Sequence, residues 1–152
     1  MREMKTLILG LGNPILGDDS AGLKVAEIVR QRMAFNPSIE VSVDYSGGLR
    51  LMERMIGYDK VIIVDAICTG AYPPGSLLYL KPDDIPTQHT ASTHDINLPT
   101  ALQLAATMNL KMPERIRIIA IEAENVLDFS EQCSPAVTLA LPRAADAILA
   151  EL

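Results

Sequence analysis

Short apolar runs alternate with amphipathic stretches along most of the chain. Thr6–Leu11, Lys60–Ala66 and Ile116–Ile121 are apolar almost throughout, as is typical of strands in a parallel sheet that is covered on both faces. Between the first two, Ser20–Met33 carries apolar residues at positions i, i+4, i+7 and i+8, which predicts an amphipathic helix. Strands that alternate with helices in this way indicate an α/β sandwich.

The remaining elements are shorter and are bounded by glycine, proline or polar residues. We expect a strand at Ile39–Tyr45, a helix at Leu49–Ile56, an edge strand at Ser76–Leu80, a loop at Lys81–Thr93, a helix from Asp95 or Asn97 to about Met108, and a terminal helix at Ser134–Leu152 with a kink at Pro142. No repeat or linker is evident. The sequence therefore predicts one domain over residues 1–152, a three-layer α/β sandwich with a twisted, mainly parallel sheet of about five strands.

The composition narrows the class of protein. The chain has 152 residues, 49% of them apolar, and a net charge of −6, which argues against nucleic acid as a partner. Its two cysteines, Cys68 and Cys133, are far apart and form no zinc or disulfide pattern. No apolar run approaches a membrane span or a signal peptide, so we expect a cytoplasmic protein without a membrane partner. A monomer is the default expectation.

Acidic residues follow two of the predicted strands. Asp18 and Asp19 lie between a glycine-rich loop and a predicted helix, with Asp19 or Ser20 placed to cap that helix, and Asp65 closes a buried strand. Each acid alone is typical of helix capping or of a turn. Because the carboxyl ends of parallel strands meet at one edge of a sheet, where ligands bind, the three together also favour a site.

The glycines of Gly10-Leu11-Gly12 invite comparison with a dinucleotide-binding loop. The third glycine of that motif would fall at Ile15, and Pro14 stands where the backbone should donate to a phosphate. The sequence therefore predicts no nucleotide cofactor.

His94 and Cys68 are two further residues that could take part in chemistry at this edge. His94 directly precedes a predicted helix, so it is either an exposed loop histidine or a third group at the same edge. One imidazole and two carboxylates form a mixed nitrogen and oxygen site suited to Zn, Ni, Mn or Fe, and they equally suit acid–base hydrolysis. Cys68 is either a buried thiol or a nucleophile with His94 as its base.

Taken together, these motifs carry a family resemblance. The chain resembles the [NiFe]-hydrogenase maturation proteases, which trim the large-subunit precursor, at Gly10-x-Gly12-Asn13, Asp18-Asp19, Gly22, Ile63-Val64-Asp65-Ala66 and His94. The resemblance covers almost the whole chain. It implies a twisted, mainly parallel sheet between helices, of the phosphorylase/hydrolase-like kind, and removal of the precursor's C-terminal extension after nickel has been loaded.

The resemblance also implies residue roles. Asp19, Asp65 and His94 are implied to bind the nickel of the precursor, so the metal belongs to the substrate, and Asp19 and Asp65 are the implied catalytic residues. The family often has Glu where this chain has Asp19. The implied substrate-binding loops contain Gly12, Asn13, Gly47 and Gly48. Either a carboxylate activates water or the metal polarises the scissile carbonyl.

Two other functions remain as alternatives. Peptidyl-tRNA hydrolase also opens with a strand that runs into Gly-x-Gly-Asn-Pro. This chain has no histidine in the twenty residues after Asn13, and its acidity is poor for binding tRNA. A metal-binding or nucleotide-binding module without catalysis is the other alternative.

Overall fold

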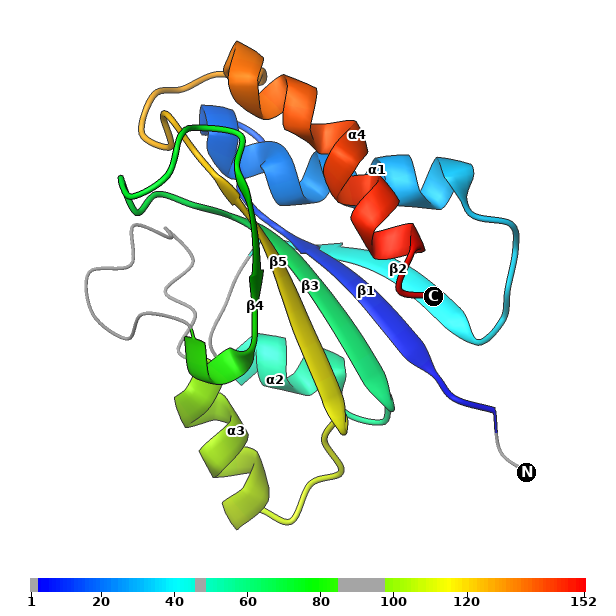
Figure 1. Cartoon of the computed structure of the whole chain (residues 1–152). Coiled ribbons are helices and arrows are strands. Elements are labelled where there is room, and N and C mark those ends of the chain that lie inside the picture. Colours follow the sequence, from blue (N-terminus) through cyan, green and yellow to red (C-terminus); the bar gives the residue numbers. More distant parts are fainter. Residues whose placement is uncertain (1–2, 46–48, 85–97) are drawn as a thin grey trace.

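Five strands form one sheet in the computed structural model, which describes residues 3–45, 49–84 and 98–152. The strands are β1 (Thr6–Leu11), β2 (Ile39–Asp44), β3 (Lys60–Ile67), β4 (Leu77–Leu80) and β5 (Arg115–Glu122). Their order across the sheet is β2-β1-β3-β5-β4 (Figure 1). All neighbours pair in parallel except β4, which is antiparallel to β5 at the sheet edge. The predicted, mainly parallel five-stranded sheet is confirmed.

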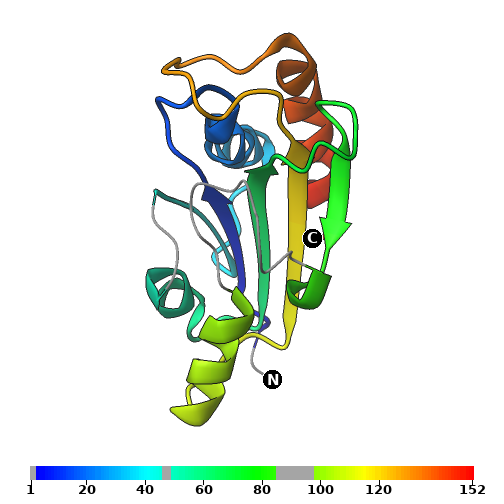
Figure 2. The same ribbon diagram turned by 90° about the vertical axis from the view of Figure 1, so that its left-hand side faces the viewer.

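Helices cover both faces of the sheet. They are α1 (Ala21–Arg32), α2 (Leu49–Met55), α3 (Leu98–Thr107) and α4 (Pro135–Leu149), with 3₁₀ turns η1 (Gly17–Ser20) and η2 (Pro82–Asp84). α1 and α4 pack together on one face, and α2 and α3 lie on the other (Figures 1 and 2). The three-layer sandwich is therefore confirmed. Within the described part of the chain, no helix is long and apolar enough to cross a membrane.

Successive residues of the central strands fill two separate apolar clusters. Ile8 and Ile62 are buried on the side of α1 and α4. Their chain neighbours Leu7 and Ile63 are buried on the side of α2. Both faces of these strands are thus covered, which explains why the strands read as continuous apolar runs. Cys68 is partly buried and packs against the first cluster.

Some predicted boundaries need correction. The helix predicted from Ser20 to Met33 is α1, which η1 precedes without a break. Ser20 stands directly before α1 in a helical backbone conformation, and its hydroxyl donates to the carbonyl of Gly17 at 2.7 Å instead of capping α1. Ser20 thus occupies the N-cap position of α1, as predicted, but its side chain does not cap the helix, because the 3₁₀ turn leaves no extended capping conformation.

At the other end of the chain, the terminal helix is shorter than predicted. α4 begins at Pro135, with Ser134 just before it, continues through Pro142 and ends at Leu149. The segment predicted as a loop at Lys81–Thr93 contains η2, and its part after residue 84 lies outside the described residues, as do the predicted cap positions Asp95 and Asn97.

Glycines allow the start of α1 to lie directly on the strand ends. A Cβ on Gly22 would lie 2.2 Å from the carbonyl oxygen of Leu11 and 2.4 Å from that of Val64. A Cβ on Gly10 would lie 2.4 Å from the carbonyl oxygen of Gly22. Only residues without a side chain fit at such distances, so these glycines bring η1 and α1 to the carboxyl ends of β1 and β3.

Substitution of Gly22 tests this close packing. We expect Gly22→Ala to lower the free energy of unfolding by about 3 kcal/mol or more, because the added methyl group meets backbone atoms that cannot rotate away. Gly57→Ala is the control: Gly57 has φ of +91° and no atom within 4 Å of an added Cβ. That variant reports only the conformational cost, about 1–2 kcal/mol. Equal losses of stability in urea unfolding would contradict the packing argument.

Candidate active site at the carboxyl edge of the sheet

Among the described residues, five buried carboxylates gather along the edge where the parallel strands end. Asp18 and Asp19 follow β1 in η1, Asp44 ends β2, Asp65 lies near the end of β3, and Glu122 ends β5. Their exposed fractions are all between 0% and 7%. A buried carboxylate is costly unless polar groups surround it, so the partners of each one indicate its role.

Asp18 ties two distant loops together. Its Oδ1 accepts the backbone N–H of Ser134 at 2.6 Å, and its Oδ2 accepts the Ser134 hydroxyl at 2.9 Å. The same Oδ2 accepts the backbone N–H groups of Glu124 at 2.9 Å and Asn125 at 3.1 Å. Both oxygens of Asp18 thus anchor the loop between β5 and α4 onto η1. Its role is structural, and nothing in the neighbouring sequence signals it, because every partner is more than a hundred residues away.

Asp19 is held by the loop that leaves β1. Its Oδ2 accepts the backbone N–H of Asn13 at 3.1 Å. A Cβ on Gly12 would lie 2.3 Å from the carbonyl oxygen of Asp19, so only glycine lets the loop pass so close. The Asn13 side chain in turn accepts the N–H of Ile15 at 3.1 Å. The structure therefore brings the predicted loop residues Gly12 and Asn13 against Asp19, while their contact with substrate stays a prediction.

Asp65 lies at the same edge, on the central strand of the sheet. Its Oδ1 accepts the backbone N–H of Ala66 at 2.8 Å. η1, which carries Asp19, contacts β3, and the carbonyl of Val64 lies against Gly22, three residues after Asp19. The structure thus places Asp19 on a turn that contacts the strand carrying Asp65, and the meeting of their carboxylates at one site stays a prediction.

The other two carboxylates flank this pair. The Oδ2 of Asp44 lies 3.7 Å from the Nε of Arg50, whose side chain is exposed. Glu122 accepts the backbone N–H of Thr69 at 2.8 Å, the Thr69 hydroxyl, and the N–H of Gly70 at 3.4 Å. Glu122 therefore fixes the loop that follows β3. Glu122 meets Thr69 only in the folded chain, where β3 and β5 are neighbours in the sheet.

Three predicted site residues lie outside the described residues: His94, Gly47 and Gly48. Within the described ranges, no group of three or more His, Cys, Asp or Glu side chains is arranged to hold a metal ion. Asp19 and Asp65 are two of the three predicted nickel ligands, and the predicted site needs His94 as the third.

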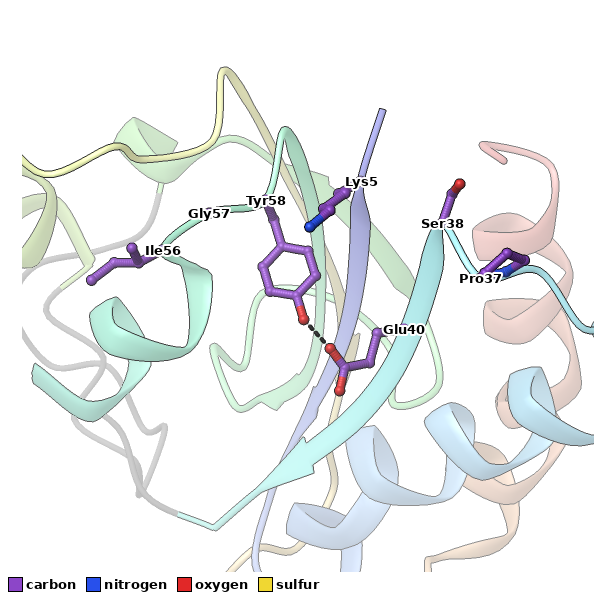
Figure 3. A pocket seen from close by; sticks show the side chains of 7 residues that line it. All are labelled: Lys5, Pro37, Ser38, Glu40, Ile56, Gly57 and Tyr58. Atoms are coloured by element: carbon purple, nitrogen blue, oxygen red, sulfur yellow. Dashed lines mark hydrogen bonds between the residues drawn. The ribbon is translucent and has the colours of Figure 1, made fainter. Parts of the chain in front are cut away.

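A separate hollow lies at the opposite, amino edge of the sheet. It has a volume of about 320 Å³ and is lined by Lys5, Pro37, Ser38, Glu40, Ile56, Gly57 and Tyr58 (Figure 3). The hydroxyl of Tyr58 donates to the carboxylate of Glu40 across it. Of the predicted site residues that the structure describes, none lines this hollow, so it is not part of the candidate active site.

Known proteins resemble the chain over nearly its whole length. A sequence model described as hydrogenase maturation protease matches residues 23–151. The hydrogenase 2 maturation protease of Escherichia coli (strain K12) is 27% identical over 151 residues, which are 98% of this chain and 91% of that protein. The hydrogenase expression/formation protein HoxM of Azotobacter vinelandii is 27% identical over 152 residues, covering 93% of this chain and 72% of that protein.

Solved structures agree with these sequence relatives. The E. coli hydrogenase maturating endopeptidase HybD superposes with a TM-score of 0.84 at 25% identity, over 98% of this chain and 92% of that one. The [NiFe] hydrogenase maturation protease HybD of Thermococcus kodakarensis shares the fold, with a TM-score of 0.74 at 23% identity over 97% and 98% of the two chains. Since the sequence model spans well over half of the chain, the protein belongs to the hydrogenase maturation protease family and is a peptidase of hydrogenase processing.

Proposed function

We propose that the protein is the endopeptidase that removes the C-terminal extension of a [NiFe]-hydrogenase large-subunit precursor after nickel has been loaded. The observation that carries this proposal is the pair of buried carboxylates, Asp19 and Asp65, at adjoining strand ends in a chain of this family. The carboxyl edge of a parallel sheet is the usual place for a binding site in this class of fold.

Nickel enters the proposal as part of the substrate. Asp19, Asp65 and His94 would supply two carboxylates and an imidazole, a donor set that suits a divalent first-row metal ion. Such a set completes the coordination of a metal that the precursor already holds. Binding of the metal then distinguishes the loaded precursor from the unloaded one, so that cleavage follows nickel insertion.

Two routes to peptide-bond cleavage use this arrangement. In one, Asp19 or Asp65 accepts a proton from the attacking water, whose oxygen bonds to the scissile carbonyl carbon; the C–N bond then breaks, and the proton passes to the departing amine nitrogen. In the other, the substrate's nickel polarises the carbonyl oxygen, and the carboxylates hold the metal in place. The rate depends on the identity of the bound metal in the second route and much less in the first.

Precursor samples that differ only in their metal test the proposal. We expect a loss of mass from the C-terminus of nickel-loaded precursor, and no loss from precursor that was stripped of nickel with a chelator before mixing. Mass spectrometry of the two products is the measurement. Equal cleavage of both samples would remove nickel as a recognition element. Failure of the folded protein to cleave loaded precursors would overturn the endopeptidase proposal.

Three further properties of the protein stay predictions. These are the absence of a nucleotide cofactor, action as a monomer, and a location in the cytoplasm. The peptidyl-tRNA hydrolase and the non-catalytic binding module have no observation of their own in this structure, so neither is proposed.

A further inference from the structure

Three large apolar side chains stand exposed at the carboxyl edge, on two loops that are bonded to each other. Ile15, in the loop after β1, is 47% exposed, and Leu127 and Phe129, in the loop after β5, are 77% and 83% exposed. The N–H of Ser130 donates to the carbonyl of Ile15 at 2.8 Å, and the N–H of Gly17 donates to the carbonyl of Ser130 at 2.8 Å. Figure 2 shows the two loops side by side at the top of the molecule. We call Ile15, Leu127 and Phe129 the rim patch.

The backbone under the rim patch is firmly held. The side-chain oxygen of Asn125 accepts the N–H groups of Leu127 at 2.9 Å and Asp128 at 3.1 Å. The amide nitrogen of Asn125 donates to the Asp128 carboxylate at 2.6 Å. The backbone N–H of Asn125 is in turn bound by Asp18. A fixed loop that presents apolar side chains to water is typical of an interaction surface, because little ordering entropy remains to be lost on binding.

The loop that carries most of the patch is acidic. Residues 123–134 contain Glu124, Asp128 and Glu131 and no Lys or Arg. A hollow of about 310 Å³ opens beside the patch, and Asp128 and Gln132 are among its polar lining residues. The complementary surface is therefore an apolar recess with basic side chains around it. A second copy of this chain fits poorly, because it would bring the same acidic loop, on a chain of net charge −6, against itself.

The rim patch also lies next to the candidate active site. Ile15 is four residues before Asp19, and the Gly17 that binds Ser130 belongs to the same η1 turn as Asp19. A protein whose peptide bond reaches Asp19 must cover the surface beside η1. We propose that the rim patch is the docking surface for the folded body of the hydrogenase precursor, which seats there while its C-terminal segment enters the site. This inference rests on the proposed function.

Substitutions in the patch separate docking from chemistry. The test variant is Leu127→Ser with Phe129→Ser, and Phe129→Leu is the conservative variant. The matched control is Phe35→Ser, since Phe35 is 92% exposed on the connection between α1 and β2. For each protein, steady-state cleavage of nickel-loaded precursor gives kcat and KM, and fluorescence anisotropy of labelled precursor gives Kd. Thermal unfolding and sedimentation report folding and self-association.

We expect the double variant to raise KM and Kd roughly tenfold or more with kcat unchanged, while Phe129→Leu and Phe35→Ser stay near wild type. Wild-type KM and Kd in the folded double variant would overturn docking and leave the proposed function intact. Self-association lost only in the double variant would also overturn it, in favour of an interface between copies. If the wild-type protein bound the precursor without cleaving it, the proposed function would be overturned. The Kd values of the wild type and the double variant would still decide whether the rim patch is the docking surface. A wild-type protein that neither binds nor cleaves the precursor would overturn both.

Discussion

We expect replacement of Asp65 by Asn to lower the cleavage rate of nickel-loaded precursor by roughly 10²–10⁴-fold while the chain stays folded. Asn keeps an oxygen that can accept the N–H of Ala66, a hydrogen bond that Asp65 makes in the structure. It lacks the negative charge that a base or a metal ligand requires at this position. The effect is therefore expected in kcat/KM and not in the free energy of unfolding.

A matched substitution far from the strand ends controls this experiment. Asp146 lies on α4 with a side chain 68% exposed, and its carboxylate pairs with Arg32 at 2.6 Å. Asp146→Asn should leave both cleavage and folding close to wild type, because an exposed ion pair contributes little. The sequence prediction extends the loss of processing to His94→Ala. Wild-type kcat/KM in a folded Asp65→Asn protein would remove Asp65 from the site.

The second large effect is on stability. Asp18→Ala is expected to lower the free energy of unfolding by about 3–5 kcal/mol, because it removes the acceptor for three backbone N–H groups and one hydroxyl. Those donors lie in a loop packed against η1, where water replaces the lost bonds incompletely. Urea unfolding followed by circular dichroism measures the loss.

Asp146→Ala is the comparison for this variant, since it also removes an aspartate carboxylate but from an exposed position. Its expected cost is under about 1 kcal/mol. If Asp18→Ala cost no more than Asp146→Ala, the anchoring role of Asp18 would be wrong. Asp18→Asn should also destabilise the protein, because its amide group turns a donor toward other donors.

The strands were the most predictable part of the fold. β3 and β5 were located to within a residue at each end, since a strand covered on both faces must be apolar throughout, and the chain shows this directly. The place of Asp65 followed from the same reasoning. α1 was located equally well, but the 3₁₀ turn before it and the close approach of Gly22 were not predicted, because they depend on contacts with β3.

Asp18 and Asp19 show why local sequence could not sort the site residues. As neighbours with the same side chain, they read as equivalent. In a 3₁₀ turn, successive side chains project about 120° apart, so one reaches the loop after β5 and the other reaches Asn13. Only the folded chain reveals that difference. The roles of His94, Gly47 and Gly48 still rest on the family resemblance.

The two edges of the sheet face opposite ways, and this has a practical consequence. β1 begins next to Lys5 at the amino edge, beside the hollow (Figure 3). Asp19, Asp65 and the rim patch belong to the carboxyl edge, where the parallel strands end. A protein coupled to a sensor surface through its amino end would therefore turn the candidate active site toward the solution. That orientation makes the chain well suited to real-time capture of intact hydrogenase precursors.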